Sequence, residues 1–273
     1  MNGAPTDLGG YRVDREIGRG GHARVYRAHH PDDPDRPVAL KILDEAHRIP
    51  AEHDRLDREF GFAAELAHPH VVAVHRHGPH WLAMQYVDGG NATGLRTVAD
   101  KLLVVAQIAD ALDYAHRRGI VHGDVKPANI LIAADLLRGG AVLIDFGAAH
   151  AVVDDVWKRR PAPEVSLPYT APELLCGRAP TAATDEYALA CTAVELLTGT
   201  PPFTAQSAAD LMNAHLRLLP PPVSATLGPA ARGADVVLQR ALAKFPARRY
   251  RSCSEFADEL SAALARPPGP SQT

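Results

Sequence analysis

The chain has few cysteines, no long apolar run and no excess of positive charge, and each of these shortages excludes a class of protein. Its three cysteines, Cys176, Cys191 and Cys253, are odd in number and widely spaced, which fits reduced thiols better than a disulfide framework or a zinc site. No segment approaches the ~18 uninterrupted apolar residues of a membrane helix. A net charge of -3 leaves no basic footprint for nucleic acid.

The N-terminus also lacks a targeting segment. Residues 1–10 contain no basic region followed by an apolar run, so no signal peptide is expected and the chain is assigned to the cytoplasm. With 46% hydrophobic and 22% charged residues, the 273-residue chain can bury one large core or two modest lobes. The composition therefore predicts a soluble globular protein.

The stretch from Ile120 to Leu131 places an acid, a cation and an amide within six residues. Apolar residues at both ends predict short buried strands, while a glycine and a proline between them break regular structure. The carboxylate of Asp124 can take a proton from an attacking hydroxyl, and the ammonium of Lys126 can offset charge on a moving phosphoryl group. The amide of Asn129 can hold a metal ion. An ordinary polar loop is the alternative interpretation.

Near the N-terminus, residues 11–27 predict two strands joined by a glycine-rich turn. A hairpin without a ligand explains such glycines equally well, because glycine serves tight turns generally. In the functional interpretation, Gly18 and Gly20 let backbone amides approach nucleotide phosphates while Val25 covers the base.

A Pro- and Asp-rich turn is expected over residues 31–37, followed by a buried strand, Val38 to Leu43, which contains a single ammonium at Lys41. A buried lysine needs a partner, unless it reaches solvent from the strand end. Helical spacing predicts a helix over residues 51–67. Its expected apolar face consists of Leu56, Phe60, Ala63, Ala64 and Ala67.

Further elements are predicted along the rest of the chain. We expect strands at 71–74, 81–84 and 141–144, and helices at 100–118 and 181–199. The first of these helices has an apolar stripe and Gly119 at its C-terminal end; the stripe comprises Leu103, Ile108, Leu112 and Ala115. Asp145, where a strand stops, can bind Mg²⁺ or simply be a turn residue.

Five histidines, at positions 68, 70, 75, 77 and 80, suggest a metal site. They occupy a turn and the surroundings of strands without a fixed ligand frame, so solvated side chains are the preferred interpretation.

These motifs occur in the order found in protein kinases. The catalytic stretch resembles the pattern His-Arg-Asp-x-x-x-x-Asn, with Gly123 in place of Arg. Residues 38–41 resemble Val-Ala-Ile-Lys, and 145–147 match Asp-Phe-Gly. Residues 171–173 match Ala-Pro-Glu, and Ser166 replaces the usual Thr of that segment. Across about residues 11–264 the chain thus resembles the bacterial eukaryotic-like, or Hanks-type, serine/threonine protein kinases.

The resemblance implies an α+β fold of two lobes. A small β-rich N-lobe is expected at about residues 11–84, a hinge at 85–89 and a larger helical C-lobe at 90–264. Residues 1–10 are then an N-terminal extension, and 265–273 a Pro-rich tail. ATP would lie in the cleft between the lobes with Mg²⁺, or Mn²⁺ in its place.

The resemblance also assigns roles to residues. Lys41 would hold the α and β phosphates, with Glu59 chosen as its partner over Glu52, Asp57 and Glu65. Asn129 and Asp145 would hold the metal, and Asp124 would deprotonate the acceptor hydroxyl beside Lys126. The nucleotide would be enclosed by Ile17, Gly18, Gly20, Val25, Ala39, Lys41, Met84, Gln85, Val87 and Leu131.

In this family, an acid such as Asp185 ties down the catalytic-loop backbone, and Arg249 would pair with Glu173. Ala23 departs from the third glycine of the family's glycine-rich loop and adds one methyl group where that loop would close over phosphate.

Two rival functions stay open. A small-molecule kinase is favoured by His-Gly-Asp, the form that this loop takes in proteins resembling aminoglycoside phosphotransferases, but opposed by Lys126 and the Ala-Pro-Glu segment. A nucleotide-binding scaffold without catalysis is favoured by Ala23 and Gly123, but opposed by the intact catalytic residues.

The expected partners are ATP and protein substrates with serine or threonine acceptors, the chain itself included. A homodimer is one option for its assembly. Many bacterial relatives continue from a Pro-rich linker into a membrane span, so the chain is expected to be either a soluble kinase or the cytoplasmic domain of a longer membrane-anchored one.

Regulation is predicted from a shortage of hydroxyl groups. Residues 148–165, which match the activation loop, contain no Ser, Thr or Tyr, and the arginine that would receive a phosphate is replaced by Gly123. We therefore expect activity that does not depend on phosphorylation of this loop. Ion pairs would order the loop instead, between Asp154 or Asp155 and one of Lys158, Arg159 and Arg160.

Overall fold

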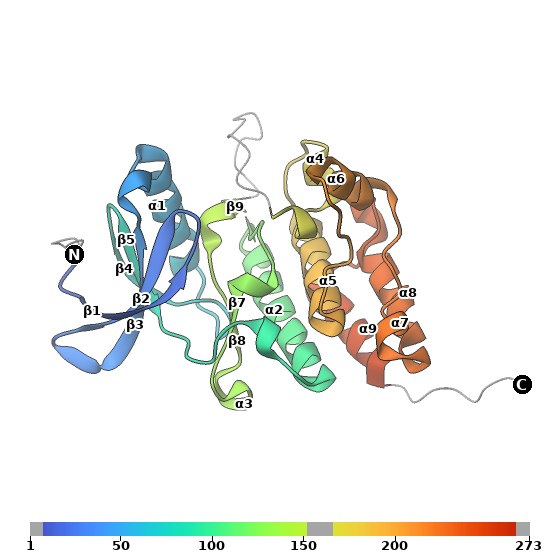
Figure 1. The fold of residues 1–273 in the computed structure, drawn as a ribbon, viewed down its shortest axis with the longest axis horizontal. Helices are drawn as coiled ribbons and strands as arrows, with labels where there is room; N and C mark the ends of the chain where they lie inside the picture. The colour runs from blue at the N-terminus through green and yellow to red at the C-terminus, as the bar shows by residue number, and fades with distance from the viewer. Residues whose placement is uncertain (1–7, 152–165, 266–273) are drawn as a thin grey trace, which may run out of the picture.

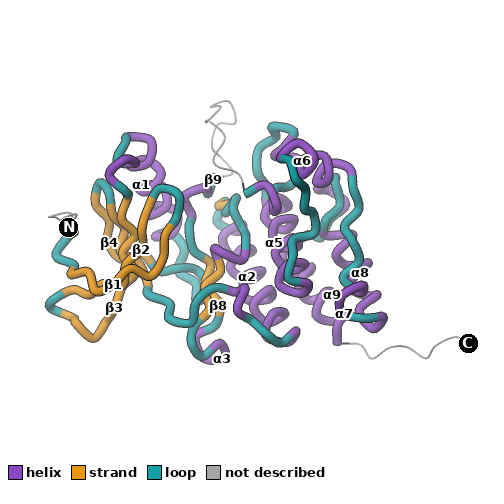
Figure 2. Tube along the Cα trace, in the orientation of Figure 1, coloured by secondary structure: helices purple, strands orange, loops and turns teal. Residues whose placement is uncertain are grey.

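The fold is taken from a computed structural model that describes residues 8–151 and 166–265 (Figure 1). It consists of a lobe built on an antiparallel sheet and a second lobe that is mainly helical (Figure 2). The two-lobed α+β architecture expected from the sequence is therefore confirmed.

The N-lobe contains a five-stranded antiparallel sheet with the strand order β1-β2-β3-β5-β4. Its strands are β1 (Arg12–Arg19), β2 (Ala23–His30), β3 (Asp33–Leu43), β4 (Val74–Gly78) and β5 (Trp81–Gln85). The predicted hairpin and the buried strand with Lys41 are both present. Leu8 packs into the sheet's own apolar cluster, with 6% of its surface exposed. The expected N-terminal extension thus contributes at least one residue to this core.

Two elements of the N-lobe differ from the prediction. The turn expected over residues 31–37 is shorter, because Asp33 already pairs with His30 and the exposed first half of β3 extends the hairpin. The strand expected at 71–74 is also wrong. Val71 and Val72 are buried beside the strand that precedes Asp145, and β4 begins only at Val74.

Helix α1 (Pro50–Ala64) crosses behind the sheet and begins with a proline, which suits a first helical turn (Figure 1). It ends three residues before the predicted boundary. Its buried face is formed by Leu56, Glu59 and Ala63, whereas Phe60 is only half-buried and Ala64 and Ala67 are exposed. Leu56 and Ala63 are therefore buried as predicted, but Phe60, Ala64 and Ala67 are not, and the acid Glu59 is buried beside them instead.

The C-lobe is built around two long helices, α2 (Val98–Arg117) and α5 (Ala182–Thr198). The side chain of Thr97 accepts a hydrogen bond from Asp100 N at the start of α2. Gly119 (φ 73°) and Gly199 (φ 87°) follow the two helices in conformations that favour glycine. The other helices are α3 (Leu136–Gly139), α4 (Pro172–Leu175), α6 (Ala208–Arg217), α7 (Ser224–Leu227), α8 (Arg232–Ala241) and α9 (Cys253–Ala265).

The predicted helices at 100–118 and 181–199 are therefore confirmed. In the first, Ile108, Leu112 and Ala115 are buried as expected, but Leu103 is half-buried because Val104 and Val105 face the core instead. Helix α5 is buried along most of its length and forms the centre of the lobe.

Two short two-stranded antiparallel sheets flank the catalytic stretch. Strand β6 (Ile120–Val121) pairs with β9 (His150–Ala151), and β7 (Ile130–Ile132) pairs with β8 (Ala141–Leu143). The catalytic stretch therefore begins and ends in strands, as the sequence predicted.

Helix α9 includes Ala265, so the Pro-rich tail begins at least one residue later than expected.

The ion pairs predicted within 154–160 lie outside the described residues. Within the part of the chain that the structure describes, no helix is long and apolar enough to span a membrane.

Candidate active site

Lys41 and Glu59 form an ion pair between the sheet and α1. Lys41 lies near the C-terminal end of β3, opposite Val25 on one side and Leu82 on the other. Its Nζ atom is 2.7 Å from Glu59 Oε2, and the two side chains are 18% and 4% exposed. Burial opposes the charged ammonium, but Asp145 and Glu59 outweigh it and raise the pKa of Lys41. The lysine is therefore a fixed positive charge.

The rival partners of Lys41 have contacts elsewhere. Glu52 lies 3.0 Å from His22, and Asp57 lies 3.2 Å from His77. Glu65 is exposed at the end of α1. The choice of Glu59 as the contact of Lys41 is confirmed.

Asp145 brings the C-lobe to the same lysine. Its Oδ1 atom lies 3.4 Å from Lys41 Nζ and accepts a hydrogen bond from Gly147 N at 3.4 Å. Burial opposes ionisation here, but Lys41 and Arg55 lower the pKa of Asp145 to about 2. Among the residues described, it is the only non-glycine residue with a positive φ, at 66°. Such a backbone aims the carboxylate at a cost in strain.

Arg55 was missed by the sequence analysis. Its guanidinium lies against the turn after Asp145. Arg55 Nε is so near Gly147 that a Cβ atom placed on that glycine would be only 2.9 Å from it. It is four residues before Glu59 on α1, and this spacing places both side chains on one helix face. The four-residue spacing from Glu59 was the only sequence signal for Arg55. It predicts that Arg55 faces the site only once Glu59 is known to face inward.

The catalytic loop is linked internally by three polar side chains. Lys126 Nζ lies 2.7 Å from Asp124 Oδ2 and 2.7 Å from Ser166 Oγ. Asn129 Nδ2 donates to the Asp124 backbone oxygen at 2.9 Å and to its Oδ2 at 3.0 Å. The acid, cation and amide predicted from the sequence therefore meet.

Asp185 holds the backbone just before the catalytic acid. Its side chain is fully buried and accepts hydrogen bonds from His122 N and Gly123 N, each at 2.8 Å. His116 Nε2 lies 2.8 Å from its Oδ2 atom. Burial opposes its charge, but the bond with His116 contributes most to lowering the pKa of Asp185. The predicted anchoring contact is present.

His122 joins the loop to the strand before Asp145. Its Nδ1 atom accepts a hydrogen bond from Asp124 N at 3.2 Å, so the proton of a neutral ring lies on Nε2. Nε2 then donates to the Ile144 carbonyl at 3.1 Å.

Gly123 occupies a position that disfavours larger residues. Its φ is 79°, and a Cβ atom there would lie 2.9 Å from the Ala148 carbonyl oxygen. The catalytic loop and the segment after Asp145 therefore approach each other backbone to backbone, where the family pattern has an arginine.

Glu173 and Arg249 form a buried bidentate ion pair. Arg249 Nη1 donates to Glu173 Oε1 at 2.8 Å, and Nη2 donates to Oε2 at 2.7 Å. The side chains are 4% and 0% exposed. The predicted pairing is present.

The residues predicted to enclose a nucleotide lie on the N-lobe sheet and in the segment that follows it, except Leu131, which lies on β7 of the C-lobe. Ala39 and Met84 are buried, whereas Val25, Gln85, Val87 and Leu131 are half-buried. Ile17 and Gly20 are exposed, and Gly18 is half-buried. Gly20 N donates to the Ala23 carbonyl at 2.8 Å, so the glycine turn closes with alanine at its end.

The predicted hinge is fastened to the C-lobe. Gly89 N donates to the Ile132 carbonyl at 2.9 Å, and Ile132 N donates to the Gly90 carbonyl at 2.8 Å.

Two of the five histidines considered as metal ligands have separate contacts. His68 lies 3.1 Å from Asp110, and His70 lies 2.8 Å from the Ala141 carbonyl.

Comparison with known proteins agrees with this geometry. Residues 11–253 match the family model described as the protein kinase domain. The chain therefore belongs to the protein kinase family, more narrowly to its bacterial Hanks-type serine/threonine branch. Members of this family use ATP with a divalent metal ion.

Its relatives include three kinases of Mycobacterium tuberculosis. The chain is 41% identical to serine/threonine-protein kinase PknJ, over 96% of this chain and 46% of the relative. It is 38% identical to PknF, over 98% of this chain and 59% of the relative. It is 37% identical to PknH, over 95% of this chain and 43% of the relative. The chain thus spans about half the length of the curated relatives it matches.

Proposed function

We propose that the chain transfers the γ-phosphate of ATP to serine or threonine hydroxyls of proteins, its own included. The observation that carries the proposal is that Lys41 contacts Glu59 of α1 at 2.7 Å and Asp145 of the C-lobe at 3.4 Å. This arrangement joins both lobes around one fixed cation, as phosphoryl transfer requires. It favours an active enzyme over a nucleotide-binding scaffold.

The oxygen atoms available in the site suit Mg²⁺, or Mn²⁺ in its place. Asn129 uses its amide nitrogen to hold Asp124, which leaves its carbonyl oxygen as a ligand. Asp145 contacts Lys41 and Gly147 through Oδ1, which leaves Oδ2. We assign the metal to Asn129 and Asp145. When bound there, ATP would supply the γ-phosphoryl group and the metal ion would neutralise charge on its oxygens.

The remaining steps belong to side chains of the chain itself. Asp124 orients the acceptor hydroxyl and takes its proton at the carboxylate, and Asn129 fixes that carboxylate. Lys126 already contacts Asp124 and is placed to offset charge on the transferred group. Lys41 would hold the α and β phosphates. The glycine turn, hinge and Leu131 would enclose the rest of the nucleotide, as the resemblance implies.

A protein is favoured over a small molecule as the acceptor. Lys126 also contacts Ser166, which precedes the Ala-Pro-Glu segment, and Glu173 of that segment is anchored by Arg249. A rigid segment beside the catalytic acid fits an extended peptide.

Incubation with labelled ATP, a generic protein acceptor and a panel of aminoglycosides tests these alternatives. We expect label on serine or threonine of the protein. Label confined to aminoglycosides would indicate the small-molecule kinase, and nucleotide binding without any transfer would indicate a scaffold.

We also propose that activity does not require phosphorylation of residues 148–165. Gly123 has no side chain to receive a phosphate, and the nearest serine and threonine hydroxyls on the C-terminal side are in use: Ser166 contacts Lys126, and buried Thr170 donates to the Ser166 carbonyl at 3.1 Å. Enzyme stripped by phosphatase should phosphorylate a protein acceptor without a lag. Activity that returns only as Ser166 or Thr170 is phosphorylated would refute this.

We assign the chain to the cytoplasm, in soluble form or as part of a membrane-anchored kinase, because its three cysteines are free and ATP is its co-substrate. The proposed homodimer is tested by the mass of the protein in solution.

A further inference from the structure

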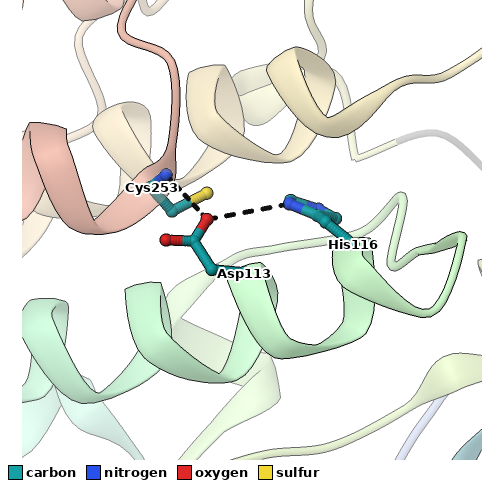
Figure 3. Close-up of side chains that lie close together, drawn as sticks. All are labelled: Asp113, His116 and Cys253. Atoms are coloured by element: carbon teal, nitrogen blue, oxygen red, sulfur yellow. Dashed lines mark hydrogen bonds and ion pairs between the residues drawn. The ribbon is translucent and has the colours of Figure 1, made fainter.

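A second group of ligand-type side chains lies outside the catalytic site, between α2 and α9 (Figure 3). Asp113 and His116 are three residues apart on α2, and Cys253 is the first residue of α9. One ligand atom from each lies within 4.8 Å of the others. Figure 3 shows the three side chains pointing toward one another across the gap between the two helices.

The imidazole of His116 is oriented as in many metal sites. Its Nε2 atom lies 2.8 Å from a carboxylate oxygen of fully buried Asp185. A carboxylate can only accept, so Nε2 carries a proton, and in a neutral ring Nδ1 then holds a free lone pair. Nδ1 faces Asp113 Oδ1 at 3.9 Å, which is too far for a hydrogen bond. Metal-binding histidines commonly donate their other nitrogen to a carboxylate in this way.

The carboxylate of Asp113 is held equally firmly. Cys253 N donates to its Oδ1 atom and Ser254 N to its Oδ2 atom, each at 2.9 Å. Each carboxylate oxygen has a second lone pair, so these bonds orient the group without exhausting it. The Cys253 thiol beside it is 1% exposed.

The buried charges favour a cation. Asp113 and Asp185 are two carboxylates with low exposure, and His116 lies between them. Buried carboxylates are stable only when they are compensated. Each acid already accepts two backbone N–H bonds, Asp113 from Cys253 and Ser254 and Asp185 from His122 and Gly123, and a dication beside Asp113 would add to this compensation.

We propose that Asp113, His116 and Cys253 form a zinc site that ties α2 to the start of α9. Mixed nitrogen, sulfur and oxygen ligands suit Zn²⁺, whereas the all-oxygen donors at Asn129 and Asp145 suit Mg²⁺. On binding, the Cys253 sulfur forms a bond to zinc and its proton passes to solvent, and water completes the coordination. Because His116 also contacts Asp185, the site adjoins the anchor of the catalytic loop.

The test uses untagged protein of residues 1–273, stripped of metal with a chelator and then titrated with Co²⁺. A bound thiolate produces a sulfur-to-cobalt charge-transfer band in the near ultraviolet. We expect this band to saturate at one equivalent per chain, to be abolished by Zn²⁺ and to persist in excess Mg²⁺.

The variants Cys253→Ser and Cys253→Ala should lose the band, while Cys176→Ser, which changes the exposed cysteine, should keep it. Zn²⁺ should raise the Tm of the wild type and of Cys176→Ser, but not of either Cys253 variant. Circular dichroism checks that each variant is folded. A wild type without the band, or a band that survives in folded Cys253→Ser, would overturn the zinc site.

Discussion

The buried pair of Glu173 and Arg249 leads to the sharpest stability prediction. Replacing Arg249 with Ala removes both hydrogen bonds to the Glu173 carboxylate. It also removes the donors to the Ala183 carbonyl at 2.7 Å and the Ala243 carbonyl at 2.9 Å. Glu173, only 4% exposed at its side chain, would retain Thr184 Oγ1 at 3.2 Å.

Breaking such a buried pair costs about 3 to 5 kcal/mol, because one charge stays buried without compensation. In a protein of about this size each kcal/mol lowers Tm by about 2 to 4 °C, so Tm should fall by about 6 to 20 °C. Thermal unfolding followed by far-ultraviolet circular dichroism measures this change.

An exposed pair serves as the control. Arg138 Nε lies 3.5 Å from Asp135 Oδ2, with side chains 89% and 58% exposed. Arg138→Ala should change stability by less than about 0.5 kcal/mol. If Arg249→Ala and Arg138→Ala unfold at the same temperature, the structural role assigned to Glu173 and Arg249 is wrong.

Three further predictions concern single residues. Lys41→Met should abolish phosphoryl transfer in the labelled-ATP assay yet leave the protein folded, and turnover at the wild-type rate would contradict its role. Gly123→Ala should lower the free energy of unfolding by about 1 to 2 kcal/mol because of its positive φ. The contact of the new Cβ atom with the Ala148 carbonyl should lower it further. Denaturant unfolding measures this change, and an unchanged midpoint would refute it. Burial lowers the pKa of His215 from 6.5 to about 4, so the unfolded chain binds the proton first and stability should fall as pH decreases through that range. His215→Gln should flatten this decline, and equal slopes would speak against it.

Much of the active site was predictable because its residues come as local patterns. Asp124, Lys126 and Asn129 lie within six residues, so short-range geometry alone brings them together. The contact between Lys41 and Glu59 is different, since periodicity could not decide which acid on the helix faces inward. The resemblance to kinases made that choice.

The strand expected at 71–74 was misplaced for a physical reason. Val71 and Val72 have the composition of a strand, but their burial comes from packing beside β8 rather than from the sheet. The true strand, β4, is an edge strand with exposed polar residues, and it lacks an apolar pattern. Single-sequence patterns report burial and cannot tell which element supplies it.

The group of Asp113, His116 and Cys253 was also beyond the sequence. Its cysteine and its acid are 140 residues apart and meet only because α9 packs on α2. Arg55 escaped notice for the same reason, since the turn it contacts is distant in sequence.

Phosphoamino-acid analysis of a protein acceptor tests the proposed function most directly, with wild type and Asp124→Asn compared in parallel. Both proteins receive ATP labelled at the γ position, and binding of a fluorescent nucleotide verifies that each site is intact. We predict labelled phosphoserine or phosphothreonine with the wild type and almost none with Asp124→Asn, because that variant cannot take the hydroxyl proton. Label on tyrosine alone, or equal labelling by both proteins, would contradict the proposal that this chain is a serine/threonine kinase with Asp124 as its base.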